Sequence, residues 1–254
     1  MINDIRLVFD LTRYDIKAQA KETFLGAIWL FLWPVLQSGG LIVVFSALQG
    51  GAVSRDFVLS TYIGIITWST CVMIFIAGLQ VMKTHRETIT QLVFPFHLLP
   101  VVDLCSKFIF FAMQFVIAAI LWAAFATVDP GGLFALNILV FVFALFCYLL
   151  AASWLASVLG IVAPDLAFAL PPIFLLLLIL SPIFHRTPGG LPETIEIINA
   201  FNPLVFVVRT LFDVLGTDGG GTSFPLIFLL GGLAAVLVAR WVVHVLYQEL
   251  GKVI

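Results

Sequence analysis

Six long runs of apolar residues, separated by short segments rich in glycine, proline or charge, dominate the sequence. Their approximate bounds are 24–49, 57–82, 101–128, 133–162, 166–184 and 224–247. A helix needs about 20 mainly apolar residues to cross roughly 30 Å of hydrocarbon. Helices also satisfy their own backbone hydrogen bonds in lipid, whereas an open sheet does not. The runs therefore predict an all-α integral membrane protein with six transmembrane helices.

The composition agrees with this class and argues against a water-soluble domain. Of 254 residues, 62% are hydrophobic and 10% are charged, and the mean hydropathy is +1.18. A soluble domain usually carries about a quarter charged residues. The net charge of −2 gives no support for nucleic-acid binding. Cys71, Cys105 and Cys147 lie within apolar runs without CxxC spacing, which predicts small buried side chains and no metal ligands.

Segment 1–23 predicts an amphipathic helix at the membrane interface. A charged stripe and a neighbouring apolar stripe recur there at helical spacing: Arg6, Asp10, Arg13, Lys17 and Lys21, beside Ile2, Ile5, Phe9, Ile16 and Ala20. Such a helix can lie along the bilayer surface with its cations toward lipid headgroups or a cytosolic partner. A solvated helix with one basic side is the alternative interpretation.

Segment 185–223 is too apolar for a free loop, yet its apolar residues are too few to cross a bilayer. Glycine-rich turn signals lie near both of its ends, and the apolar residues between them are Leu204, Val205, Val207, Val208, Leu211, Phe212 and Leu215. We predict short re-entrant or interfacial helices here, on the extracytoplasmic side.

Lysine and arginine are distributed unevenly between the loops on the two sides. With a cytoplasmic N-terminus and six spans, three cations lie outside, namely Arg55, Arg186 and Arg209. Nine lie inside: Arg6, Arg13, Lys17, Lys21, Lys83, Arg86, Lys107, Arg240 and Lys252. Because cytoplasmic loops carry the excess of such residues, both termini are predicted to be cytoplasmic.

Motifs of the common enzyme sites are absent from the sequence. It contains no GxxxxGK[ST] phosphate loop, no GxSxG and no HExxH. Its four histidines, His85, His97, His185 and His244, lie in separate segments. We therefore expect no enzyme, no metal site and no cofactor bound by this chain.

Ionisable residues, which an ion-driven transporter needs in mid-membrane, are scarce in the runs. Asp103 and Lys107 are four residues apart near the inner end of the third run, where we expect a local salt bridge. The deeper polar residues are neutral, among them Gln37, Gln80, Gln114 and Asn137. This pattern disfavours an ion-driven pump.

Two tryptophans, Trp29 and Trp33, lie one helical turn apart in the first run. Aromatic residues at such positions form an interface belt or pack between helices. Alternatively, their faces can stack on sugar rings along a channel. The sequence leaves both interpretations open.

Several short motifs, in order along the whole chain, resemble one family. Residues 13–17 read Arg-Tyr-Asp-Ile-Lys, and Leu25-Gly26, Trp29 and Trp33-Pro34 follow. Later come Phe-Pro-Phe-His-Leu-Leu-Pro at 94–100, Ser-Pro-Ile-Phe at 181–184, and Asn202-Pro203-Leu204 with Arg209. This series is similar to the membrane subunits of ABC-2 type exporters for bacterial polysaccharides such as O-antigen, capsule and teichoic acid. One departure is Pro164-Asp165, where the family commonly has Arg-Asp.

The resemblance implies a single ABC-2 transmembrane domain over 1–254, working as a homodimer with two copies of a separate ATPase subunit that binds ATP and Mg. Segment 83–100 would be the cytoplasmic coupling segment, with His85, Arg86 and Glu87 contacting the ATPase. Arg13, Lys17, Trp29 and Trp33 would lie where a lipid-linked polysaccharide enters and crosses. Segment 185–223 would form the extracytoplasmic gate, with Asn202, Pro203 and Arg209. Such a permease resides in the bacterial inner membrane and exports O-antigen for lipopolysaccharide biosynthesis.

Three other functions remain open from the sequence. The nearest is an ABC-2 permease for a drug, a lipid or another small amphiphile. The others are an intramembrane enzyme, such as a protease or acyltransferase, and a stand-alone channel.

Overall fold

The computed structural model describes residues 2–21, 28–48, 54–85, 98–125, 133–184, 193–216 and 224–250. Within these ranges the chain is helical and has no strand. The helices are α1 (Ile2–Lys21), α2 (Ile28–Leu48), α3 (Arg55–Thr84), α5 (Leu99–Phe125), α6 (Phe134–Val162), α7 (Leu166–Leu180), α8 (Glu193–Phe201), α9 (Pro203–Val214) and α10 (Phe224–Leu250). The predicted all-α class is confirmed for the described part of the chain.

Four of these helices, α3, α5, α6 and α10, are long and apolar enough to cross a membrane. The pair α8 and α9, bent by 96° at the break between them, can count as a fifth. The other apolar helices are shorter: α7 has 15 residues, and the apolar part of α2 is Val35–Ala47. The chain is thus a multi-pass membrane protein with four or five candidate spans among the described residues, and six spans stay a prediction.

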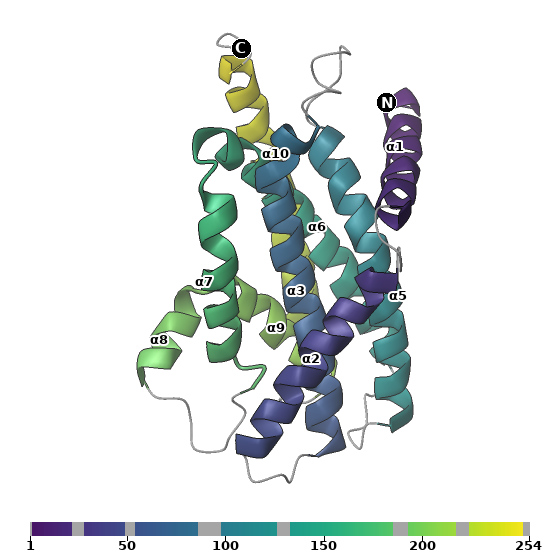
Figure 1. The fold of residues 1–254 in the computed structure, drawn as a ribbon, viewed down its shortest axis with the longest axis vertical. Coiled ribbons are helices and arrows are strands. Elements are labelled where there is room, and N and C mark those ends of the chain that lie inside the picture. Colours follow the sequence, from purple (N-terminus) through teal and green to yellow (C-terminus); the bar gives the residue numbers. More distant parts are fainter. Residues whose placement is uncertain are drawn as a thin grey trace.

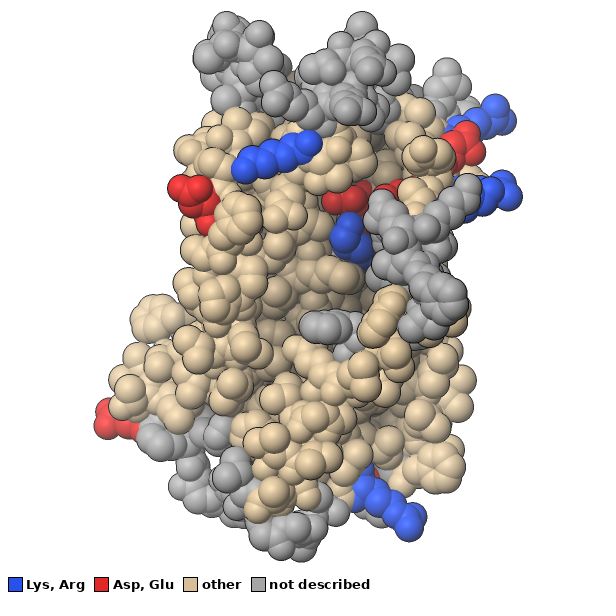
Figure 2. Space-filling view, viewed as in Figure 1, with Lys and Arg blue, Asp and Glu red and all other residues tan. Residues whose placement is uncertain are grey.

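The long helices run side by side along the long axis of the molecule, and the marked N- and C-termini lie at the same end (Figure 1). At that end α3 finishes and α5 begins, whereas α8 and α9 lie toward the opposite half (Figure 1). Figure 2 shows charged side chains toward the two ends of the visible face, with an uncharged band between them. This distribution is the one expected of a bundle whose middle lies in hydrocarbon.

Small residues allow the central helices to pack closely. Helix α3 packs against α5, α6 and α7, and α6 also packs against α10. A Cβ added at Gly78 of α3 would lie 2.9 Å from Cβ of Ala156 on α6. One at Gly232 of α10 would lie 3.0 Å from the main-chain oxygen of Ala144. In membranes, where burial of apolar surface gives little drive between helices, close approach at small residues supplies packing energy instead.

Helix α1 packs against α5. Leu7, Val8 and Leu11 contact a buried cluster of Val81, Leu98 and Leu99 at the ends of α3 and α5. Members of the predicted apolar stripe point elsewhere: Ile5 is 65% exposed and Phe9 is 68% exposed. The predicted helix is therefore confirmed, but the face that packs on the bundle is adjacent to the predicted one. Figure 1 draws α1 along the bundle axis, and its place at an interface stays a prediction.

Helices α8 and α9 confirm that segment 185–223 contains short helices. The break between them is at Asn202, whose extended backbone precedes Pro203 at the first position of α9. The Asn202 side chain accepts a hydrogen bond from the Leu204 backbone N–H at 3.1 Å, and so caps the helix. The apolar face of α9, including Val208 and Leu211, is buried in the main core. The placement of α8 and α9 on the extracytoplasmic side stays a prediction.

Replacing Asn202 by alanine is expected to lower the free energy of unfolding by about 1 kcal/mol, the usual cost of losing a helix cap. Asn202→Ser, which keeps an acceptor oxygen at the cap, should lose less than half as much. The thermal unfolding midpoint of the purified protein in detergent measures both changes. Equal midpoints for the alanine and serine variants would contradict the capping role.

Candidate functional site

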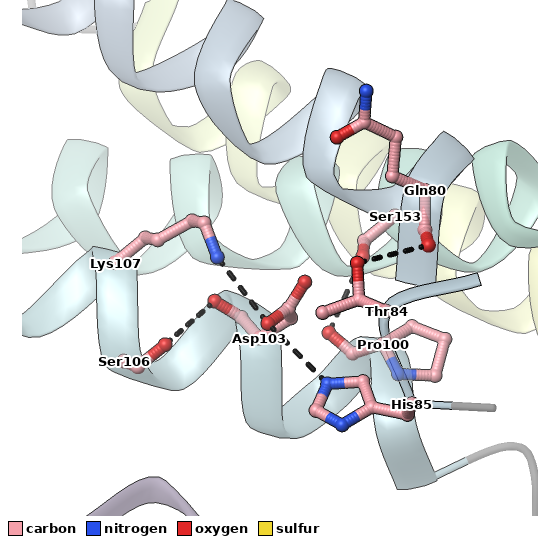
Figure 3. A network of polar contacts seen from close by, with 8 residues as sticks. All are labelled: Gln80, Thr84, His85, Pro100, Asp103, Ser106, Lys107 and Ser153. Carbon is pink, nitrogen blue, oxygen red and sulfur yellow. Dashed lines mark hydrogen bonds and ion pairs between the residues drawn. The ribbon is translucent and has the colours of Figure 1, made fainter. Parts of the chain in front are cut away.

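A charged cluster lies where α3 ends and α5 begins (Figure 3). His85 follows the last residue of α3, and its backbone N–H donates to the Val81 carbonyl at 3.0 Å. Oδ1 of Asp103, on the first turns of α5, lies 3.3 Å from Nζ of Lys107. The same oxygen lies 3.8 Å from Nε2 of His85, which is an ion-pair distance but too long for a hydrogen bond. The predicted salt bridge between Asp103 and Lys107 is confirmed.

Hydroxyl groups hold the backbone around this cluster. The Ser153 hydroxyl on α6 donates to the Pro100 carbonyl at 3.3 Å, and so joins α6 to the first turn of α5. The Ser106 hydroxyl donates to the Asp103 carbonyl at 3.1 Å. The Asp103 side chain is 11% exposed and faces Lys107 and His85. A carboxylate so buried is stable as a charge because the Lys107 ammonium faces it.

A cavity of about 540 Å³ lies between α2, α3, α5 and α7. Ligand pockets in proteins commonly have volumes of roughly 300–1,000 Å³. The polar side chains that line it come from α2, α3 and α5: Gln37, Ser69, Thr70, Lys107 and Gln114. Aromatic side chains form much of the remaining wall: Trp29, Trp68, Phe110, Phe111 and Phe174. A recess is visible in the middle of the face drawn in Figure 2.

Lys107 belongs both to the charged cluster and to the cavity wall. Its side chain is 16% exposed, and its ammonium group is directed at Asp103. Asp103 also faces His85, the last described residue at the end of α3, so its carboxylate lies between His85 and the cavity-lining Lys107. Lys107 and Asp103 thus connect the cavity to His85, one of the residues predicted to contact the ATPase.

The residues singled out in the sequence occupy separate places. Trp29 lies on the cavity wall, and its role in a channel stays a prediction. Arg13 and Lys17 are exposed on α1 and are not among the residues that line the cavity. Asn202, Pro203 and Arg209 belong to the α8–α9 region. Arg86 and Glu87, and the side chain of Trp33, lie outside the described residues.

Sequence reasoning missed the His85 contact and most of the cavity. His85 is distant from Asp103 in sequence, and only the packing of α3 against α5 brings them together. In the sequence Gln37 and Gln114 are only neutral polar residues in apolar runs, yet both line the cavity. Polar side chains in hydrocarbon are costly unless they find hydrogen-bond partners. The presence of glutamines within apolar runs was therefore the sequence signal that pointed to such partners.

The cluster and the cavity are suited to binding. Among the described residues, no group of three His, Cys, Asp or Glu side chains is placed to hold a metal ion. The cavity has a mainly apolar wall with a few amide, hydroxyl and ammonium groups, a combination common in ligand pockets.

Comparison with known proteins gives a distant similarity. The chain is 20% identical to the O-antigen export system permease protein RfbA of Myxococcus xanthus over 205 residues, which is 80% of this chain and 78% of that protein. No protein-family model matches the chain. The similarity supports, distantly, an ABC-2 type permease. Together with the membrane helices, it suggests a transporter subunit in place of an enzyme.

Proposed function

We propose that this chain is the transmembrane subunit of an ATP-driven ABC exporter that moves a lipid-linked polysaccharide across the bacterial inner membrane. The observation that carries the proposal is the similarity to an O-antigen export permease along four fifths of the chain. The apolar helices support it, because their bounds agree with the predicted runs within a few residues. The protein works as a homodimer, with both termini in the cytoplasm.

The energy comes from two copies of a partner ATPase that bind ATP and Mg. Segment 83–100 docks on that partner through His85, Arg86 and Glu87. Support comes from its position: the described ends of the segment, at α3 and α5, lie at the end of the molecule that also holds both termini (Figure 1). The buried Asp103 beside His85 gives this docking segment a fixed attachment to the bundle.

The substrate meets the cations of α1 first. Arg13 and Lys17 are exposed, and guanidinium and ammonium groups bind phosphate oxygens well. They suit the diphosphate that joins a glycan to its lipid. The bent pair α8 and α9 closes the opposite side, with Asn202 and Pro203 at the bend and exposed Arg209 on α9. Two copies of the bundle enclose the path between them, since one copy has too few helices to surround a glycan chain.

The proposal is tested by purifying the protein with its candidate ATPase and reconstituting both in liposomes. We expect a stable complex whose ATP turnover rises with lipid-linked glycan and falls at least about tenfold in Arg86→Ala and Glu87→Ala. Arg55→Ala removes an exposed cation at the start of α3 and serves as the matched control with unchanged turnover. Failure to form a complex, or turnover that is indifferent to both variants, would overturn the coupled mechanism.

One observation favours a second candidate, a permease for a small amphiphile. The cavity lies within a single chain, and its volume of about 540 Å³ matches a small ligand more closely than a polymer. In the same liposomes, turnover stimulated by drugs or single-chain lipids, with no response to lipid-linked glycan, would select this candidate.

A further inference from the structure

We propose that the cavity between α2, α3, α5 and α7 holds one acyl chain of a bilayer phospholipid, which enters sideways from the membrane. This lipid is a resident part of the folded protein, so the inference goes beyond the proposed transport function and does not depend on it. The depth of the cavity, the chemistry of its wall and its volume each favour a hydrocarbon chain as the occupant.

The cavity lies at the depth of the bilayer's hydrocarbon and is open toward the side of the bundle. Two lining residues, Ser69 and Gln114, are at the middle of α3 and α5, which are both long and apolar enough to cross a membrane. Met73 and Leu175 also line it and are 38% and 48% exposed. At this depth lipid chains surround a membrane protein. A chain therefore reaches the opening directly, whereas a polar solute first has to leave water.

Most of the cavity wall is aromatic or aliphatic. Trp68 and Val72 of α3 form one part, Phe111 of α5 another, and Phe174 and Leu178 of α7 a third. Such side chains gain dispersion energy from methylene groups packed against them, and they forfeit it beside a void. An acyl chain supplies these contacts along its whole length.

Polar side chains in the wall are engaged with other groups of the protein. The Ser69 hydroxyl donates to Oε1 of Gln37 at 3.1 Å. The Lys107 ammonium lies 3.3 Å from the Asp103 carboxylate, and Gln114 has an interaction of its own. A hydrocarbon chain breaks none of these contacts. An anion at Lys107 would instead compete with the Asp103 carboxylate, at a cost in free energy in a poorly solvated site.

The volume of the cavity suits a single chain. A methylene group is nearly the size of a water molecule, so about 540 Å³ gives room for on the order of 18 such groups at about 30 Å³ each. This is the length of one phospholipid acyl chain. A much longer isoprenoid chain, of the kind that carries glycans, would extend out of the cavity.

The test uses a phospholipid with bromine at the middle of its acyl chain, because bromine quenches tryptophan fluorescence at close range. The purified protein is reconstituted in nanodiscs of this lipid or of its unbrominated counterpart. Trp68 is buried and lines the cavity, so a chain in the cavity brings bromine to it. The difference between the unaltered protein and Trp68→Phe isolates the Trp68 emission. We expect the brominated lipid to remove more than half of that emission.

Trp122 provides the matched control, because it is buried in α5 like Trp68 in α3 but does not line the cavity. The variant Trp122→Phe isolates its emission, which should be quenched much less. Equal quenching of both tryptophans would mean that bromine acts from the surrounding bilayer. An unquenched Trp68 would mean that no chain enters, as when a second copy of the protein covers the opening. Either result overturns the inference.

A cavity-filling variant tests the place of the lipid without a change of tryptophan. Val72→Phe adds a ring to the wall of the cavity and should at least halve the quenching of Trp68. Native mass spectrometry of the protein in mild detergent should show one retained phospholipid fewer per chain. Ile117→Phe, at an exposed position of α5 outside the cavity, should leave both results unchanged. Equal lipid retention in the two variants would contradict the proposed place.

A competition experiment distinguishes the two sources of a hydrocarbon chain. Polyprenyl phosphate is added in increasing amounts to the protein in brominated nanodiscs, and the Trp68 emission is followed. We expect the quenching to persist, because the resident phospholipid chain stays in place. Recovery of the Trp68 emission would assign the cavity to the isoprenoid chain of a lipid carrier and overturn the phospholipid assignment.

Discussion

Gly160→Ala is expected to prevent most of the protein from folding. Gly160 lies on α6 where α6 meets α3, and a Cβ built there collides with the backbone carbonyl group of Leu79. Backbone within a helix cannot rotate away as a flexible side chain can, so the two helices must separate. Overpacking of this kind costs about 3 kcal/mol or more, a large part of the roughly 5–15 kcal/mol that stabilises a typical domain.

The measurement is the yield of monodisperse protein after detergent extraction, together with its thermal unfolding midpoint. Gly40→Ala provides the matched control, because a Cβ added at Gly40 on α2 meets nothing within 4 Å. That substitution should leave stability unchanged or raise it by up to about 1 kcal/mol, since alanine favours a helix over glycine. If Gly160→Ala and Gly40→Ala fold equally well, α3 and α6 do not approach each other as closely as the structure shows.

Asp103→Asn is expected to lower the free energy of unfolding by about 3 kcal/mol. It removes the charge that compensates Lys107 and faces His85, and an uncompensated buried cation costs about 3–5 kcal/mol. We expect the lower end of that range, because the Lys107 side chain borders the cavity and is 16% exposed, so it is not fully desolvated. Thermal unfolding in detergent measures the loss.

Two further variants separate charge from shape in this prediction. Asp165→Asn changes an exposed aspartate and should shift the unfolding midpoint little. The double variant Asp103→Asn with Lys107→Gln removes both charges and should recover more than half of the lost stability, because no charge is left unpaired. If the double variant is as unstable as the sum of the single variants, the pair does not act as a unit.

The sequence by itself determined the helical class and the bounds of the long helices. Each apolar run appears as a helix, and the ends of α6, predicted at 133–162, are observed at Phe134 and Val162. The reason is local. A backbone in hydrocarbon has to bond within its own segment, so apolar length and the turn residues at its ends specify each helix without reference to any other part of the chain.

The faces of the helices were decided only by the tertiary structure. In α1, Leu7 and Leu11 pack on the bundle, whereas Phe9 of the predicted stripe is exposed. Helix α1 carries apolar residues on more than one side, because Leu7 and Leu11 lie beside the stripe of Ile5 and Phe9, so periodicity does not tell which apolar side packs on the bundle.

The candidate site was likewise assembled by packing between helices. Trp29 was singled out as a channel residue, but its neighbours in the cavity come from three other helices, including Lys107 and Gln114 on α5. His85 meets Asp103 only because α3 and α5 lie side by side. Polar residues in an apolar run reveal that partners are needed. Which partners they find depends on the rotation and crossing of whole helices, because contacts between distant segments arise from packing that no single segment encodes.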